Sequence, residues 1–184
     1  MLNVEIGPRD TPAGDDDTVY VDCVARPCVS HVVVWGADKL PFVDESVASI
    51  YASHVIEHVP WFQTDYALAE AFRVLQPGGR ITLFTPDFEM IVAAYLQRTI
   101  PDTDPWRRFN EAGDPMKWVN ARIFAYFNEV EGPENLHKSA HDFESLSRQL
   151  MLAGFVDAVR ADRKAGETPH GQIEFGITAV RPLN

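Results

Sequence analysis

The stretch RVLQPGGRITLFTPD, residues 73–87, joins a helix-like segment to a strand-like segment and then to the start of another helix. The Pro-Gly-Gly sequence at 77–79 is a helix-stop signal. Residues 80–85 are mostly apolar or β-branched, which predicts a buried strand. Thr85 is the predicted N-cap of the next helix, because Pro86 would then occupy the first helical position. A helix, a strand and a helix in succession are typical of an α/β sheet.

The rest of the chain continues this alternation. Strands are predicted at 2–6, 18–24, 31–35, 47–53, 80–85, 156–162 and 172–181, and helices at 64–75, 85–98 and 142–155. The pattern predicts a Rossmann-like α/β fold: a mostly parallel sheet of about seven strands with an antiparallel strand at the C-terminal end. The links between the first three strands hold about ten residues or fewer, which is short for a helical crossover. We therefore expect reduced helices in the N-terminal part.

One domain is predicted over residues 1–184. The segment at about 99–138 interrupts the pattern with scattered proline, tryptophan and charged residues. It is too short to form a core of its own, so it is interpreted as an insertion with one or two helices.

Composition and charge exclude several classes of protein. The formal net charge is −11, and such a surface repels phosphate backbones, so no nucleic-acid partner is expected. No apolar run approaches the roughly 20 residues that a membrane helix needs. The chain enters a strand-like segment directly after Met1, without the pattern of a signal peptide, which makes a cytoplasmic location the default expectation.

The sequence SHVIEHVP, residues 53–60, contains His54, Glu57 and His58 at the H-x-x-E-H spacing of some zinc peptidases. That motif needs a helix that places both imidazoles on one face. Here a predicted strand comes before His54, Pro60 follows closely, and no third ligand is evident from the sequence. We therefore predict no metal, and expect a short turn near a binding pocket.

Four segments occur in order along the first half of the chain: VEIGP, VYVD, ADKLPFVDESVASIYASHVIEH and AFRVLQPGGRITLFTPDF. Together they resemble class I S-adenosylmethionine-dependent methyltransferases, in the compact bacterial branch of the type 11-like group. The resemblance covers residues 2–90, with a weaker echo in HKSAHDFESLSRQLMLAGF, residues 137–155. It implies S-adenosylmethionine as the cofactor, and it implies that the insertion acts as a lid over the substrate pocket.

The resemblance also implies a set of cofactor contacts. Gly7, followed by Pro8, would let the backbone approach the methionine end of the cofactor, with Glu5 beneath it. Asp22 would accept hydrogen bonds from the ribose hydroxyls. The other implied contacts are Ala37, Asp38 and Leu40 around the adenine, and Ser53 and His54 at the mouth of the fourth strand. The alternatives are structural: a turn residue at Gly7, a cap at Asp22 and a solvated charge at Asp38.

Three residues depart from the family pattern. Arg9 stands where a second glycine is usual, Gly36 where an acid often contacts the adenine amine, and Ala48 where an acid begins the fourth strand. Two functions therefore stay open. One is methyl transfer to a small-molecule or glycan acceptor, and the other is a catalytically degenerate, methyltransferase-like binding protein.

Methyl transfer from a sulfonium depends mainly on proximity and alignment, and hydroxyl acceptors need a base in addition. The candidate base is His58, with His54 and His137 as further candidates, because an imidazole titrates near neutral pH. The expected partner is a small-molecule or glycan substrate, and the sequence leaves a homodimer open.

Overall fold

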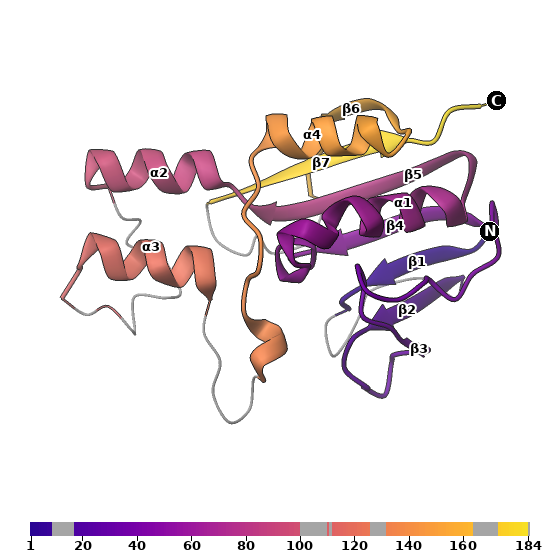
Figure 1. The fold of residues 1–184 in the computed structure, drawn as a ribbon, viewed down its shortest axis with the longest axis horizontal. Coiled ribbons are helices and arrows are strands. Elements are labelled where there is room, and N and C mark those ends of the chain that lie inside the picture. The colour runs from indigo at the N-terminus through magenta and orange to yellow at the C-terminus, as the bar shows by residue number, and fades with distance from the viewer. Residues whose placement is uncertain (9–16, 100–109, 111, 126–131, 164–172, 184) are drawn as a thin grey trace.

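A computed structural model describes residues 1–8, 17–99, 110, 112–125, 132–163 and 173–183. Its strands form one seven-stranded sheet in the order β3-β2-β1-β4-β5-β7-β6 (Figure 1). Their bounds are β1 Asn3–Ile6, β2 Thr18–Asp22, β3 His31–Val32, β4 Val47–Ser53, β5 Leu75–Pro86, β6 Val156–Arg160 and β7 Glu174–Val180. The first five strands pair in parallel, and β7 runs antiparallel to both β5 and β6. The predicted fold class is confirmed.

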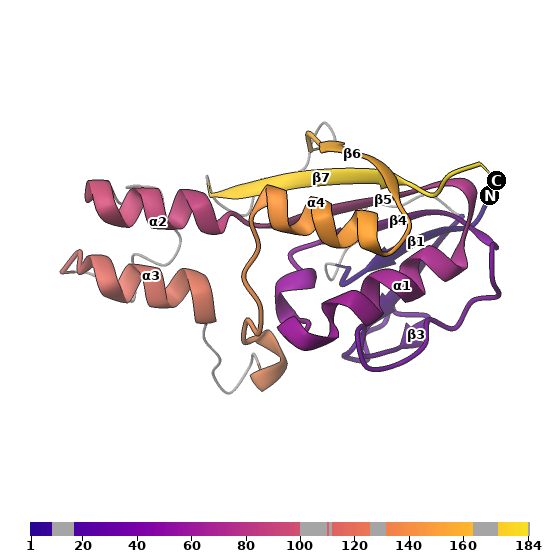
Figure 2. The same cartoon turned by 45° about the horizontal axis from the view of Figure 1, so that its top comes forward.

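The helices gather along one face and one end of the sheet. Their bounds are α1 Thr64–Val74, α2 Phe88–Gln97, α3 Pro115–Phe124 and α4 Phe143–Leu152, with 3-10 turns η1 Ile56–His58, η2 Trp61–Gln63 and η4 Pro133–Asn135. Figures 1 and 2 show α1 and α4 side by side over the sheet, whereas α2 and α3 extend beyond the end of β5. Among the described residues before β4 there is no helix, as the short links predicted.

The opening stretch folds slightly differently from its prediction. The chain is already extended at Leu75, which pairs with Val47, so the Pro-Gly-Gly sequence lies within β5 at a register shift. The N-cap of α2 is Asp87, whose side chain accepts from the Met90 amide at 3.2 Å. The prediction of Thr85 as N-cap was wrong, because Thr85 is buried in β5 and donates its hydroxyl to Glu57.

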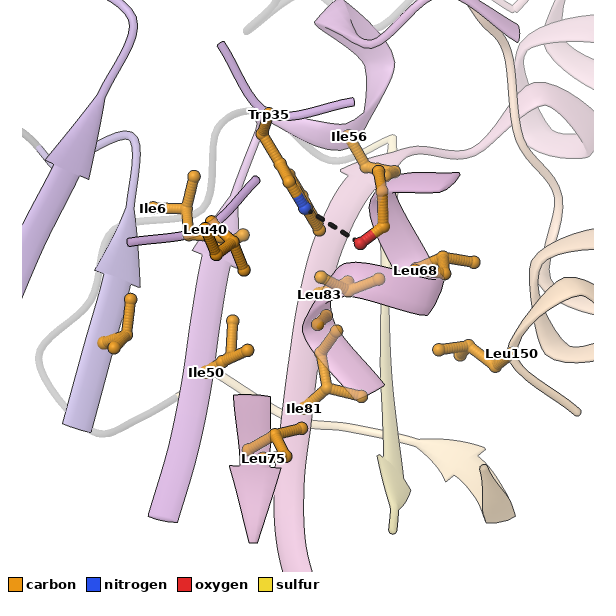
Figure 3. Close-up of a cluster of buried hydrophobic side chains, with 14 of the residues drawn as sticks. Ile6, Trp35, Leu40, Ile50, Ile56, Leu68, Leu75, Ile81, Leu83 and Leu150 are labelled. Atoms are coloured by element: carbon orange, nitrogen blue, oxygen red, sulfur yellow. Dashed lines mark hydrogen bonds between the residues drawn. The ribbon is translucent and has the colours of Figure 1, made fainter. Parts of the chain in front are cut away.

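The main core lies between the sheet and the helices α1 and α4. It contains alternate residues of the strands and the inner faces of these helices: Val4, Ile6, Ile50, Ala52, Ile81, Leu83, Leu68, Ala71, Leu146 and Leu150. Trp35 belongs to the same cluster and donates its indole N–H to the Ala67 carbonyl at 3.0 Å (Figure 3). This bond fastens the segment after β3 to α1.

The described part of the expected insertion adds α3, which packs on α2 in a second, smaller apolar cluster. That cluster contains Ile91, Trp118 and Ile173. Residues 100–109, 111 and 126–131 of the predicted insertion, and Arg9 near the N-terminus, lie outside the described residues. None of the helices in the described part of the chain combines the length and apolarity that crossing a lipid bilayer would require.

Candidate cofactor and acceptor site

A cavity of about 500 Å³ opens at the carboxyl ends of the first parallel strands. β1 pairs with β2 on one side and with β4 on the other, so the direction of the strand order reverses beside β1. Open α/β sheets bind their ligands at such a switch point. The cavity lining includes Gly7, Asp22, Cys23, Val33, Trp35, Val55, His58, Val59, Glu134 and Lys138.

Gly7 begins the loop after β1 in a conformation that other residues rarely adopt. Its φ is +70°, and its amide donates to the Val21 carbonyl of β2 at 2.8 Å. A Cβ atom on Gly7 would lie 2.4 Å from Cγ2 of Val55. Glycine is therefore needed both for the turn and for the close approach of the two loops, and its bare backbone faces the cavity.

The Gly7→Ala variant is expected to lose about 2 kcal/mol of unfolding free energy. The left-handed backbone disfavours a Cβ by roughly 1–2 kcal/mol, and the contact with Val55 adds to that cost. Urea unfolding measures the loss. The double variant Gly7→Ala/Val55→Ala removes the clash but keeps the strained φ, so we expect less destabilisation than from Gly7→Ala plus Val55→Ala measured singly. Strict additivity would contradict the contact.

Asp22 ends β2 and lines the same cavity from the neighbouring strand. Its side chain is largely buried, and Oδ1 accepts from the Val24 amide at 3.1 Å. Oδ2 lies 3.7 Å from Arg26 Nη1, which also donates to the Pro8 carbonyl at 3.1 Å. Arg26 thus links the loops after β1 and β2, through a long ion-pair contact with Asp22 and a hydrogen bond to Pro8.

The loop after β3 forms an apolar wall of the cavity, which the sequence did not identify. Val33, Val34 and Trp35 line it. Gly36, the departure from the family pattern, has a φ of +96°, and a Cβ there would lie 2.6 Å from Val59 Cγ1. The local packing therefore explains why no acid stands at this position.

The structure does not bring the three adenine-flanking residues to the cavity. Asp38 turns back, and its Oδ2 accepts from the Val34 amide at 2.9 Å, with Ala37 exposed in the same turn. Leu40 is 2% exposed and packs in the main core, where Figure 3 shows it near Ile6. The turn at 34–38 directs the segment away from the described cavity, and the adenine contacts of these residues stay a prediction.

Glu5 and Pro8, the other two implied contacts near Gly7, also lie outside the cavity lining. Glu5 is a partly buried residue of β1, in register with Tyr20 and Tyr51 on the adjacent strands. Pro8 is buried, and its carbonyl is held by Arg26. Both residues support the loop that carries Gly7.

His54 lies at the centre of a partly buried charge network at the end of β4. Nδ1 is 3.0 Å from Oε1 of Glu57, and Nε2 is 2.7 Å from Oε2 of Glu174. Glu174 also pairs with Arg163, which donates to the Ser53 hydroxyl at 3.2 Å. Ser53 and His54 therefore serve this network, and they do not line the described cavity.

The network favours the protonated form of His54. Burial alone would lower the pKa of His54, but the facing Glu57 and Glu174 carboxylates outweigh it and raise that pKa to about 9. Burial would raise the pKa of Glu57, yet His54 lowers it to about 2. His54 is thus an imidazolium at neutral pH and has no lone pair to accept a proton. In the described structure His54 has a structural role in this network, and its catalytic role stays a prediction.

His58 and His137 meet edge to face, with ring centroids 4.9 Å apart. His58 lines the cavity, and its Nδ1 lies 3.3 Å from the Leu136 carbonyl. His137 Nδ1 lies 3.1 Å from the Arg122 carbonyl, and burial lowers the pKa of His137 to about 4. The structure therefore brings two of the three candidate bases together, and His137 is neutral at physiological pH.

Three further residues that line the cavity were not predicted from the sequence. Cys23 directly follows the predicted Asp22 and could have been inferred from the strand end, but Glu134 and Lys138 come from a distant segment. Lys138 and Ser139 donate their backbone amides to the Glu57 carbonyl at 2.7 and 3.1 Å. That pairing has no local sequence signal.

Comparison with known proteins agrees with this geometry. Residues 18–83 match the family model described as a methyltransferase domain. The chain is 30% identical over 110 residues to demethylmenaquinone methyltransferase of Streptomyces avermitilis, across 56% of this chain and 46% of that protein. It is 39% identical over 75 residues to a ubiquinone/menaquinone biosynthesis C-methyltransferase of Methylobacterium nodulans, across 38% of this chain and 29% of that protein.

A solved structure shares the fold. It is 1,6-didemethyltoxoflavin-N1-methyltransferase of Burkholderia thailandensis, bound to 1,6-didemethyltoxoflavin and S-adenosylhomocysteine. The TM-score is 0.54 at 14% sequence identity, over 98% of this chain and 71% of that chain.

The chain thus has the fold of a solved S-adenosylmethionine-dependent methyltransferase, and part of its sequence is similar to methyltransferases, as its motifs predicted. Within that class, its curated relatives named here are methyltransferases of quinone biosynthesis. The matched segment spans less than half the length of these relatives. The predicted cofactor, S-adenosylmethionine, is the methyl donor of the class.

Proposed function

We propose that the chain binds S-adenosylmethionine in the 500 Å³ cavity and transfers its methyl group to a small-molecule acceptor. The observation that supports this most is that Gly7 and Asp22, from adjacent strand ends, line one cavity at the switch point of the sheet. The volume falls within the roughly 300–1,000 Å³ typical of small-molecule pockets.

Each wall of the cavity suits one part of the cofactor. The bare backbone of Gly7 admits the methionine end, and the Asp22 carboxylate is placed to accept from the ribose hydroxyls. Val33 and Trp35 offer apolar surface to the adenine. The donor carries its own activated leaving group, so the protein needs chiefly to align donor and acceptor.

A small-molecule acceptor is favoured over a glycan because both curated relatives are named for quinone biosynthesis. Its place would be on the side of the cavity formed by His58. Nδ1 of His58 faces a carbonyl, which can only accept, so the ring hydrogen lies there and Nε2 keeps a lone pair. His58 is the residue proposed to take the proton of a hydroxyl acceptor.

The Asp22→Asn variant is expected to bind S-adenosylhomocysteine about 10-fold to 100-fold more weakly. The amide oxygen still accepts from Val24, but the charge-assisted bonds to the ribose are lost, at about 1.5–3 kcal/mol. Calorimetric titration gives the affinity. Asp65→Asn, an exposed acid of α1, is the matched control and should leave the affinity unchanged.

Thermal melting tests the proposal as a whole. Ligand at a hundred times its dissociation constant adds about 2.7 kcal/mol to the free energy of unfolding. A melting temperature that does not move with millimolar S-adenosylmethionine or S-adenosylhomocysteine would overturn the proposal and favour the degenerate binding protein. Equal loss of affinity in the Asp22 and Asp65 variants would show that the ribose site is misplaced.

A further inference from the structure

Three side chains from two segments that are far apart in the sequence come together where His58 lines the cavity. Glu57, His58 and His137 each offer one ligand atom, and these atoms all lie within 4.8 Å of one another. A metal ion with bonds of about 2.1 Å holds its ligand atoms roughly 3.4 Å apart, so the group must contract by about an ångström and a half at most. His54, the first histidine of the H-x-x-E-H motif, is not part of the group, and His137 provides the nitrogen that the motif lacked.

Both imidazoles are held in the tautomer that binds metals. Each Nδ1 faces a backbone carbonyl, that of Leu136 for His58 and that of Arg122 for His137. A carbonyl only accepts, so each Nδ1 carries the hydrogen and each Nε2 presents its lone pair. Histidine ligands of metals characteristically donate the other ring N–H to a carbonyl or carboxylate in this way.

The Glu57 carboxylate is oriented by hydrogen bonds, as metal-binding carboxylates usually are. Glu57 is only 1% exposed, and Oε1 is bonded to His54 while Oε2 accepts from the Thr85 hydroxyl at 3.2 Å. These two bonds orient the group and leave lone pairs on its oxygens, because an ionised carboxylate accepts at about four sites. Hydrogen bonds to ligating carboxylates are a regular part of metal sites.

The backbone brings the two segments together before any ion binds. Lys138 and Ser139 donate their amides to the Glu57 carbonyl, and the Lys138 ammonium donates to the His58 carbonyl at 3.2 Å. The His137 amide donates to the Phe124 carbonyl at the end of α3. These bonds fix the 137–139 segment against η1, so little order remains to be gained when a ligand arrives.

We propose that Glu57, His58 and His137 form a binding site for a divalent first-row transition metal ion. Two imidazoles and one carboxylate suit Zn²⁺ or Fe²⁺, and three protein ligands leave coordination positions open. His58 also lines the large cavity, whereas Glu57 and His137 line a small pocket. With an ion bound, Nε2 of His58 would be a ligand and no longer a base, and an acceptor oxygen bound to the ion would instead have a lowered pKa. This role rests on the proposed methyl transfer, whereas metal binding itself does not.

The test is direct titration of the full chain after treatment with a chelator and its removal, with no cofactor present. Zn²⁺ followed by calorimetry should bind one ion per chain, and Co²⁺ should develop visible d–d absorption as imidazole nitrogens enter its coordination sphere. The His58→Asn variant keeps a donor toward Leu136 but loses Nε2. We expect His58→Asn and His137→Gln each to weaken Zn²⁺ binding about 100-fold or more. Loss of an outer-shell partner already costs about 10-fold to 100-fold, and loss of a ligand should cost at least the upper value.

His31→Gln is the matched control, because His31 packs on Phe42 away from the cluster. Unchanged affinity in that variant supports the site. The proposal is overturned if wild-type protein develops no Co²⁺ absorption, a result that does not depend on any variant folding. It is also overturned if the double variant His58→Asn/His137→Gln still binds Zn²⁺ tightly. Stabilisation by S-adenosylhomocysteine of metal-free protein is measured separately, so loss of metal binding and loss of cofactor binding are distinguishable.

Discussion

The His54→Gln variant is expected to lose about 3 kcal/mol or more of unfolding free energy near pH 6.5. His54 is the only cation in hydrogen-bond contact with Glu57 among the contacts described, and Glu57 is almost fully buried. Removing one member of a buried ion pair costs roughly 3–5 kcal/mol, because the other charge stays buried without its partner. Arg163 continues to hold Glu174, so the loss falls mainly on Glu57. Urea unfolding at fixed pH measures it.

The same variant should change how stability depends on pH. The pKa of His54 is raised from 6.5 to about 9, so its contribution is full below pH 6.5 and disappears as the pH rises through about 9. That difference corresponds to about 3 kcal/mol. The lowered pKa of Glu57 acts at the opposite end: its contribution is present above pH 4.5 and is lost as the pH falls toward 2.

We therefore expect wild-type protein to lose stability between pH 6.5 and 9, and His54→Gln to lose much less over that range. His31→Gln, which keeps the network, should retain the wild-type profile. If His54→Gln and wild type fall in parallel between pH 6.5 and 9, His54 does not hold the proton that the geometry assigns to it.

The Trp35→Ala variant is expected to lose about 3–5 kcal/mol of unfolding free energy. Trp35 is 4% exposed in the main core, and truncation of a buried aromatic leaves a void that the neighbours fill only in part. It also leaves the Ala67 carbonyl without its indole donor. Because Trp35 lines the cavity, affinity for S-adenosylhomocysteine should fall as well.

Trp35→Phe separates the two contributions. It keeps most of the ring volume but removes the hydrogen bond to Ala67, which is worth about 1 kcal/mol. Equilibrium unfolding of both variants, with cofactor titration of each, gives the comparison. A loss below 1 kcal/mol for Trp35→Ala would mean that the loop after β3 is not anchored to α1 through this residue.

Local signals were enough for the elements and the sheet. Asp142, the first residue of the helix predicted at 142–155, caps α4, with Oδ1 accepting from the Ser145 amide at 2.7 Å. The cap of α2 was misplaced by two residues, because the hydroxyl of Thr85 is taken by Glu57, a residue 28 positions away. Capping preference is local, but competition for a side chain by a distant partner is not.

The candidate site divides in the same way. Gly7 and Asp22 could be predicted because Gly7 directly follows β1 and Asp22 ends β2, and parallel strands end at one edge. Asp38 and Leu40 could not be placed, since a turn stabilised by Asp38 itself sends Leu40 into the core. His137 reaches Glu57 only through the backbone pairing of two segments that no sequence period records.

The small cluster of Ile91, Trp118 and Ile173 stands apart from the main core, and α3, which carries Trp118, ends where the His137 amide is bound. Two apolar nuclei of unequal size imply two opening free energies, so amides of α2 and α3 should exchange with deuterium before those of β4 and β5. Such a division lets the end of the molecule formed by α2 and α3 open while the main core keeps its cooperative stability.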